Sequence, residues 1–396
     1  MTGFGAWAAT AVEVFGEIKP LAGRLPQDRF EVVVADDEPH GDAARRLLGS
    51  VAREVGLRQA VDVRHGRERA ASSFALAVER RLRGLLRQAG PLEDWVRAEG
   101  DAPIGHAAAR ARALAPRAVR VGTPSGLVLE AFTAGDRRRP AVVLVPPCGM
   151  PVELSHRWLR ALGEDCFVVT WQSRGLFAAD GPRGGMAAGV AEQAGDLLAV
   201  MDALDLPVSH VMGLCGGAVI ALDAVHRYPE RFRSVSLWHG DYDFGPGSAK
   251  TDHQRDVQAL MELGAGSLEK ATGYQKLMHR PAALAKIPER VAPLVLYPYA
   301  TPVLFHHYCR LNSAIMSYDV TELLGDIGHP ALVVTSRTDT TAHPAGSHRV
   351  ARELARAELV EEPTGDHLSV FDTSPRLTQL AAGFVTAQHS TTPGHR

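Results

Sequence analysis

A cysteine flanked by glycines is the residue whose type and spacing most directly indicate chemistry in this chain of 396 residues. The segment Gly213-Leu214-Cys215-Gly216-Gly217 follows a mostly apolar run, Val208 to Met212, and precedes a largely apolar helical run, Ala218 to Val225. A strand, a tight glycine-flanked turn and a helix form a nucleophile elbow, which holds its central residue on a strained turn. We therefore predict that Cys215 is a nucleophile. The N–H of Gly216, at a helix N-terminus, is predicted to stabilise a developing oxyanion.

An alternation of apolar strands and helices surrounds this turn. Strands are predicted at Ala118 to Val121, Leu127 to Phe132, Ala141 to Val145, Cys166 to Trp171, Val235 to Trp238, Ala331 to Thr335 and Glu358 to Glu362. Helices are predicted at 153–162, 190–204, about 345–357 and 375–387. The first two strands suit an antiparallel hairpin, whereas continuous apolar runs separated by helices indicate a parallel sheet covered by helices. The fold class is therefore α/β.

The rest of the chain differs from this core. Residues 1–116 have helical apolar spacing around a short strand candidate, Phe30 to Val34, and predict a small, mostly helical N-terminal domain. Residues 245–327 have helical patches without alternating strands, which predicts a helical cap over a site. The core is thereby divided into 117–244 and 328–390, and residues 391–396 form a polar tail.

Composition excludes several classes of protein. A formal net charge of -2 argues against a dedicated nucleic-acid binder. No apolar run approaches the roughly 20 residues that cross a bilayer, and the start of the chain lacks the basic segment of a signal peptide. The 4 cysteines are too few and too scattered for a disulfide framework or a zinc site. We expect a cytoplasmic protein with no metal, no cofactor and no membrane partner.

In their order along the chain, these elements resemble the α/β-hydrolase superfamily over residues 118 to 388, in the branch whose nucleophile is cysteine. Cys148-Gly149-Met150-Pro151 stands where the family commonly has His-Gly-x-Pro after the third strand. Ser173-Arg174-Gly175 is similar to the family's Arg-Gly turn after the fourth strand. The resemblance implies a doubly wound, mostly parallel sheet with a helical cap, and makes the N–H of Met150 the second oxyanion donor. It does not extend to residues 1–116.

The resemblance also implies a catalytic triad in the chain order nucleophile, acid, histidine. Asp339 follows the strand at Ala331 to Thr335, and His367 stands in a Gly-x-His turn after the last strand. Acyl transfer needs a nucleophile, a base that takes its proton and a group that orients the base. Cys215, His367 and Asp339 would have these three roles.

Each assignment has an alternative. Some family members carry the acid one strand earlier, where Asp241 or Asp243 would serve. A cysteine after a strand is often a small buried side chain, although the elbow and the downstream partners favour a nucleophile here. Cys148 is either a packed small residue or, if it lies near Cys215, its disulfide partner on oxidation.

A cysteine nucleophile determines which acyl donors suit the site. The acyl-enzyme would be a thioester, close in free energy to a thioester of coenzyme A (CoA) or of an acyl carrier protein. We expect an acyltransferase or thioesterase that acts on such a donor in biosynthesis. The alternatives are a hydrolase of a small ester or lactone, and a non-catalytic member of the fold that binds a partner. The acyl group, the acceptor and the oligomeric state stay open.

Arginines are frequent in one predicted helix of the N-terminal domain, Glu68 to Gln88. They are Arg69, Arg80, Arg81, Arg83 and Arg87. Such a run is commonly a solvated helix face. The alternative is a docking face for an acidic partner, such as a carrier protein or a phosphate-bearing acyl donor.

Overall fold

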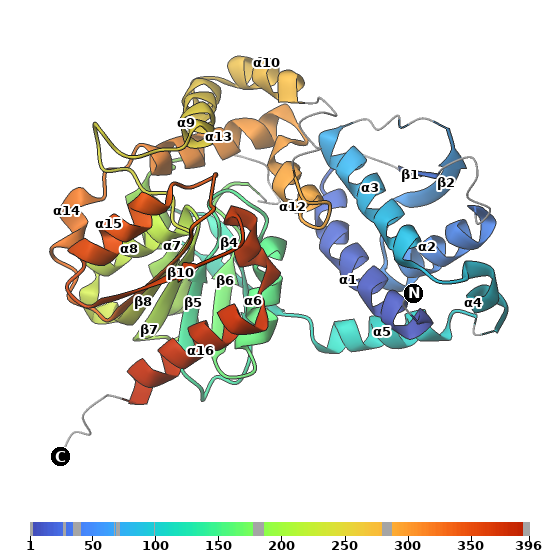
Figure 1. Cartoon of the computed structure of the whole chain (residues 1–396), viewed down its shortest axis with the longest axis horizontal. Coiled ribbons are helices and arrows are strands. Elements are labelled where there is room, and N and C mark those ends of the chain that lie inside the picture. Colours follow the sequence, from blue (N-terminus) through green and yellow to red (C-terminus); the bar gives the residue numbers. More distant parts are fainter. Residues whose placement is uncertain are drawn as a thin grey trace. The chain divides into compact units, whose positions relative to one another are not determined.

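The computed structural model describes residues 3–26, 29–34, 41–66, 68, 72–98, 100–176, 186–278 and 287–390. The predicted tail, 391–396, lies outside the described residues. The chain divides into two compact units. One contains Met1–Ala115 and Gln275–Pro302, and the other contains Pro116–Tyr274 and Val303–Arg396. Figure 1 shows the elements of both units.

An eight-stranded sheet forms the centre of the second unit, with the order β10-β9-β8-β7-β5-β6-β4-β3. Its strands are β3 (Arg117–Gly122), β4 (Val128–Ala134), β5 (Ala141–Val145), β6 (Phe167–Trp171), β7 (Ser209–Leu214), β8 (Phe232–Trp238), β9 (Ala331–Ser336) and β10 (Ala357–Glu362). The pairs β3–β4 and β4–β6 are antiparallel, and the other neighbouring pairs are parallel. The predicted α/β class, the hairpin and the mostly parallel sheet are confirmed.

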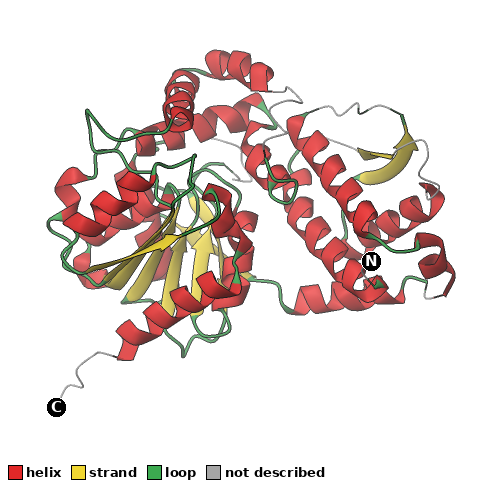
Figure 2. Cartoon of the chain, in the orientation of Figure 1, coloured by secondary structure: helices red, strands yellow, loops and turns green. Residues whose placement is uncertain are grey.

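Helices cover both faces of this sheet (Figure 2). They are α6 (His156–Leu162), α7 (Val190–Ala203), α8 (Gly217–Arg227), α15 (Pro344–Glu353) and α16 (Pro375–Ser390), and a 3-10 turn, η1 (Val152–Ser155), precedes α6. Helix α7 packs against α8, and α6 packs against α16. Because both faces are covered, every residue of the central strands β6 and β7 is buried, including Thr170, Ser209 and His210.

The segment between β8 and β9 contributes cap helices to the second unit. They are α9 (Asp252–Ala265), most of α10 (Leu268–Met278), α13 (Pro302–Met316) and α14 (Thr321–Leu324). Helix α9 begins with a capping box, in which Thr251 and Gln254 each bond the other's backbone N–H. Helices α9 and α13 pack closely at Gly264, where an added Cβ would lie only 2.4 Å from Cys309 Sγ.

One predicted boundary differs from the structure. Residues 275–302 belong to the first unit, although the sequence predicts them within the cap, 245–327. The physical reason is the burial of apolar side chains: Ala292 and Leu296 of α12 (Ala292–Leu296) pack on α3. The Tyr297 ring also meets Phe74 edge-on, with centroids 5.4 Å apart.

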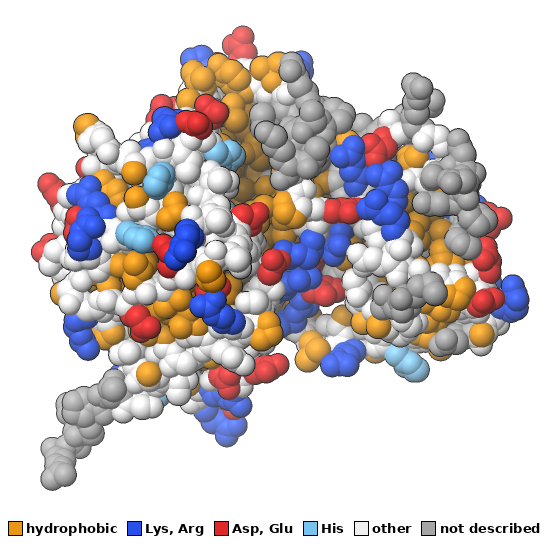
Figure 3. Space-filling view, in the orientation of Figure 1, with side chains coloured by type: hydrophobic (Ala, Val, Ile, Leu, Met, Phe, Trp, Pro, Cys, Tyr) orange, Lys and Arg blue, Asp and Glu red, His pale blue; other side chains and the backbone are white. Residues whose placement is uncertain are grey.

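The first unit is mostly helical, with one pair of parallel strands. Its elements are α1 (Phe4–Ala22), β1 (Arg29–Val34), α2 (Gly41–Val55), β2 (Ala60–His65), α3 (Ser73–Gln88), α4 (Leu92–Ala98) and α5 (Ala102–Ala113), together with α12 and a 3-10 turn, η3 (Tyr297–Tyr299). The prediction missed β2. Lys and Arg side chains gather over α3 (Figure 3). Within the described residues, no helix combines the length and the apolar character needed to cross a membrane.

Helix α3 begins later than predicted. Its first residue is Ser73 rather than Glu68, because the Ser72 side chain accepts the N–H of Ala75 and caps the helix there. Glu68 therefore lies outside the helix. Its carboxylate contacts Arg80 and Arg83 from there.

A buried carboxyl in α3 should make the stability of the chain depend on pH. Burial raises the pKa of Glu79 to about 7, although the N–H of Glu31 donates to Glu79 Oε1 and acts in the opposite direction. The folded state then binds this proton more tightly than the unfolded state, so stability is lost as pH rises from about 4.5 to about 7. We expect Glu79→Gln to remove this loss and to stabilise the chain at pH 8 by about 2 to 3 kcal/mol.

Urea unfolding of both proteins at pH 5 and pH 8 measures the effect. The exposed Glu54→Gln variant is the matched control, and it should keep the pH dependence of the wild type. A Glu79→Gln variant with an unchanged pH dependence would show that this carboxyl titrates normally in the folded chain.

Candidate active site

The chain turns sharply at Cys215, between β7 and α8. Cys215 has φ 52°, a left-handed conformation that side chains rarely adopt. Two hydrogen bonds hold it there: its N–H donates to Trp238 O at 2.9 Å, and its carbonyl accepts the N–H of Ala218 at 2.9 Å. This is the strained backbone that the elbow motif predicts.

The two outer glycines of the motif are needed because other backbone atoms approach them closely. A Cβ at Gly213 would lie 2.6 Å from the Cα of Ala218. A Cβ at Gly217 would lie 2.6 Å from the carbonyl oxygens of Val145 and Pro146. Side chains at these positions would push α8 away from the strands that it covers, so the local sequence is matched to the turn.

The two predicted oxyanion donors have different surroundings. Gly216 is the N-cap of α8, and its N–H makes no hydrogen bond within the described part of the chain. The N–H of Met150 donates to Pro147 O at 3.1 Å and closes a turn in which Gly149 has φ 70°. The structure therefore leaves the Gly216 N–H available, whereas the Met150 N–H is already engaged.

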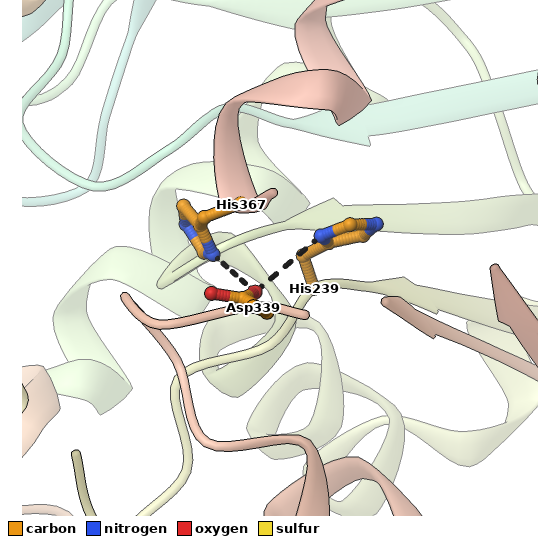
Figure 4. Close-up of side chains that lie close together, drawn as sticks. All are labelled: His239, Asp339 and His367. Carbon is orange, nitrogen blue, oxygen red and sulfur yellow. Dashed lines mark hydrogen bonds and ion pairs between the residues drawn. The ribbon is translucent and has the colours of Figure 1, made fainter. Parts of the chain in front are cut away.

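His367 and Asp339 lie together, with the imidazole Nδ1 2.9 Å from Asp339 Oδ2 (Figure 4). His367 begins a 3-10 turn, η4 (His367–Asp372), soon after β10, and Asp339 follows β9. Both side chains are buried. The N–H groups of Thr341 and Ala342 donate to Asp339 Oδ1, each at 2.8 Å. Backbone donors thus orient one carboxylate oxygen and leave the other for the histidine.

Electrostatic interactions favour the charged forms of this pair. Burial alone would raise the pKa of Asp339, but His239, His367 and the Ala342 N–H hold that pKa well below its usual range. Burial would lower the pKa of His367, but the charge of Cys215 and the hydrogen bond to Asp339 raise that pKa well above its usual range. Cys215 is therefore near enough to His367 to interact with its ring. The buried His367 Nε2 has no hydrogen-bond partner among the described residues, so it is the ring atom left for the nucleophile.

A second histidine, His239, contacts the acid. Its Nδ1 lies 3.5 Å from Asp339 Oδ2, and its buried ring meets the His367 ring edge-on, with centroids 5.9 Å apart (Figure 4). The sequence analysis did not single out His239, although it named Asp241, two residues later, as an alternative acid. The signal was its place directly after β8, since functional residues gather at the carboxyl ends of parallel strands.

His239, Asp339 and His367 offer ligand atoms that all lie within 4.8 Å of one another. Imidazole and carboxylate are donors that zinc accepts in proteins. However, His367 Nδ1 and Asp339 Oδ2 lie at hydrogen-bond distance, so the proton between them occupies the direction that a shared ion would need. The structure thus gives a hydrogen-bonded histidine–carboxylate pair.

Asp241 and Asp243, the alternative acids, have other partners. Asp241 Oδ1 accepts from Gln254 Nε2 at 2.6 Å, and Asp243 Oδ2 lies 2.5 Å from Lys250 Nζ. Burial raises the pKa of Asp241 against the Gln254 hydrogen bond and the charge of His367. Asp241 is thus near the site, but the hydrogen bond of His367 Nδ1 goes to Asp339.

Cys148 is a packed residue behind the elbow. A Cβ at Gly216 would lie 3.2 Å from Cys148 Cβ, and the Cys148 thiol donates to Gln193 Oε1 at 3.3 Å. Burial raises the pKa of Cys148, which keeps its thiol protonated and unreactive. All of the described cysteines, Cys148, Cys166, Cys215 and Cys309, are free thiols.

Helix α13 of the cap covers this side of the site. Asn312 Nδ2 donates to Cys148 O at 3.1 Å, and a Cβ at Gly149 would lie 2.7 Å from the Tyr308 ring. A Cβ at Gly216 would also lie 3.5 Å from Ile315 Cγ2. The helix therefore packs on the loop that follows β5 and on Gly216, the residue after Cys215.

Comparisons with known proteins agree on the fold and differ in the reaction. The chain matches no family profile. It is 29% identical over 235 residues to RutD of Agrobacterium fabrum, assigned as a carbamate hydrolase. This match covers 59% of this chain and 87% of RutD. It is 25% identical over 181 residues to the L-allo-isoleucyltransferase of Pseudomonas savastanoi pv. glycinea, which covers 45% of this chain and 63% of that protein. The crystal structure of the enol-lactonase from Burkholderia xenovorans matches with a TM-score of 0.55 at 19% identity, over 68% of this chain and 100% of the lactonase.

Proposed function

We propose that this chain, an enzyme of the α/β-hydrolase fold, transfers acyl groups through a covalent thioester on Cys215. One observation carries the proposal: the strained Cys215 elbow stands beside a His367 whose Nδ1 is bonded to a buried carboxylate. In this reading Cys215 is the nucleophile, His367 the base and Asp339 the group that orients the base. The protein belongs to the cysteine branch of the fold, and its free thiols suit a reducing cytoplasm.

The first half of the reaction loads the enzyme. His367 Nε2 takes the thiol proton, and the Cys215 thiolate attacks the carbonyl carbon of the donor to form a new C–S bond. The carbonyl electron pair moves onto oxygen, where the N–H of Gly216 stabilises the charge. When the tetrahedral intermediate collapses, the bond to the donor's leaving group breaks. That group takes the proton from His367, which leaves an acyl-Cys215 thioester.

The second half transfers the acyl group. His367 Nε2 removes a proton from the acceptor, whose lone pair attacks the thioester carbonyl. The Cys215 thiolate leaves and recovers its proton from His367. An amine, hydroxyl or thiol acceptor gives transfer, and water gives hydrolysis.

An activated acyl thioester, of CoA or of an acyl carrier protein, is the donor that suits a thiol nucleophile. Exchange between two thioesters is nearly balanced in free energy, so loading needs no other driving force. The similarity to an L-allo-isoleucyltransferase supports transfer, because an isoleucyl group is an acyl group. The reaction class is acyltransferase or thioesterase.

A second candidate function is hydrolysis of a small ester, lactone or carbamate. The similarity to RutD, assigned as a carbamate hydrolase, and to an enol-lactonase favours it. The same residues would act, with water as the acceptor in the second half of the reaction.

Intact-protein mass spectrometry tests the proposal. Wild-type protein is mixed with a panel of acyl-CoA thioesters and, separately, with small esters and lactones, and Cys215→Ala serves as the blank. We expect an acyl adduct from at least one thioester on wild-type protein and none on the variant. Turnover of esters or lactones, with no adduct from any thioester, would favour the hydrolase. Inert wild-type protein with every donor would favour a non-catalytic binding protein.

A further inference from the structure

The first unit contains a small basic pocket. It has a volume of about 190 Å³ and is lined by Ala77, Arg80, Arg83, Arg87, Ile287, Glu289 and Ala292. The arginines lie three and four residues apart on α3, and this spacing places their side chains on one face of the helix. The pocket therefore presents three guanidinium groups beside a short apolar wall.

Acidic side chains neutralise only part of this charge. Glu68 lies 2.7 Å from Arg80 Nη2 and 3.2 Å from Arg83 Nη2, and Glu289 lies 2.9 Å from Arg87 Nη2. The hydrogen bond from Arg80 lowers the pKa of Glu68, so this carboxyl stays ionised. Three positive charges then face two negative charges. The cluster keeps one net positive charge.

Within the described part of the chain, the three arginines also have more hydrogen-bond donors than Glu68 and Glu289 can accept. A guanidinium has five N–H groups, and two carboxylates cannot accept them all from three arginines. The buried Arg83 Nε has no hydrogen-bond partner in the part of the chain that the structure describes. The Arg87–Glu289 pair is solvent-exposed and hence weak, with 54% and 38% of the two side chains accessible. An incoming anion can use the free donors and replace Glu289 on Arg87.

We propose that this pocket binds the phosphate groups of a pantetheine thioester, the chemistry shared by coenzyme A and by the phosphopantetheine arm of a carrier protein. The planar fork of arginine matches phosphate oxygens in pairs, and a phosphate brings the negative charge that the cluster lacks. The side chains of Ala77, Ile287 and Ala292 give an apolar wall for the carbon chain next to the phosphate. The identity of the ligand as an acyl donor rests on the proposed function.

Binding to the full-length chain tests the pocket directly. Titration calorimetry with pyrophosphate and with CoA is expected to detect binding to wild-type protein. The double variant Arg83→Ala/Arg87→Ala should weaken it at least about tenfold, a loss appropriate for two charge-assisted contacts. The matched control, Arg97→Ala/Arg110→Ala, removes the same charge from exposed positions of α4 and α5 and should bind as the wild type does.

A second variant excludes loss of folding as the explanation for weaker binding. Glu289→Gln removes a negative charge and frees Arg87, so it should bind CoA more tightly than wild-type protein, by about threefold to tenfold. A misfolded protein cannot show such a gain. Equal binding by wild type and all variants, or no binding of either CoA or a phosphopantetheinylated carrier protein to wild type, would overturn the proposal. Binding of the carrier alone would identify the carrier as the source of the phosphate.

Kinetics separate this inference from the proposed function. Acyl-CoA carries phosphates, whereas the corresponding N-acetylcysteamine thioester has the same reactive group without them. The Arg83→Ala/Arg87→Ala variant should lose about tenfold in kcat/KM for acyl-CoA and nothing for the short thioester. Arginine-dependent CoA binding without any Cys215 adduct would sustain the pocket and refute the acyl-transfer mechanism. A Cys215 adduct without arginine-dependent CoA binding would refute the pocket and leave the acyl-transfer mechanism in place.

Discussion

Replacing Cys215 by alanine is expected to lower kcat by about 10⁶, the size of loss seen when a catalytic nucleophile is removed from another triad enzyme. Without the thiol no acyl-enzyme can form, and His367 has no proton to accept. The variant should fold, because alanine lacks only the sulfur of cysteine and the backbone hydrogen bonds to Trp238 and Ala218 stay in place. Steady-state turnover on the best donor, with circular dichroism as a check of the fold, measures this prediction.

The buried Cys166, outside the site, supplies the matched control. Cys166→Ala removes the same sulfur and should keep kcat within about twofold, since surface and packing changes far from a site rarely alter chemistry. Cys215→Gly should be as inactive as Cys215→Ala but more stable by about 1 kcal/mol, because glycine adopts a positive φ without strain. A Cys215→Ala enzyme with wild-type turnover would exclude a covalent cysteine mechanism.

Asp339→Asn is expected to lower kcat by about 10⁴ with little change in KM, the loss that the same exchange causes in a serine protease triad. The carboxylate Oδ2 accepts the proton of His367 Nδ1 and lies near His239 Nδ1. An amide that turns its NH₂ toward this histidine forces the other tautomer, in which Nε2 carries the proton and cannot act as a base. Turnover of the variant measured across pH checks this cause, because the amide no longer supplies the buried negative charge that favours the imidazolium of His367.

Asp241→Asn decides between the two candidate acids. Its carboxylate bonds Gln254 rather than His367, so this exchange should cost less than about tenfold in kcat. The reverse pattern, a severe loss at Asp241 and a mild one at Asp339, would place the acid one strand earlier. Because the two residues are exchanged in the same way, differences in side-chain volume do not enter the comparison.

Local patterns predicted much of the second unit. The strand predicted at Ala141 to Val145 has those bounds in the structure, and β3 and β6 begin one residue away from their predicted starts. The elbow was also readable, because Gly213, Cys215 and Gly217 are neighbours in sequence and their conformations depend on one another. The side chain at 339 could be placed beside the one at 367 because both follow parallel strands, whose carboxyl ends meet at one edge of the sheet.

The amino-acid sequence by itself thus determined the order of strands and helices, the sharp turn at Cys215 and the edge of the sheet where chemistry is possible. Tertiary structure alone decided that residues 275–302 join the first unit, that His239 contacts Asp339 and that the Met150 N–H closes a turn. The physical reason is range. Periodicity and turn residues report the local backbone, whereas these contacts join segments far apart in the chain, or depend on which of several nearby acceptors a donor meets after folding.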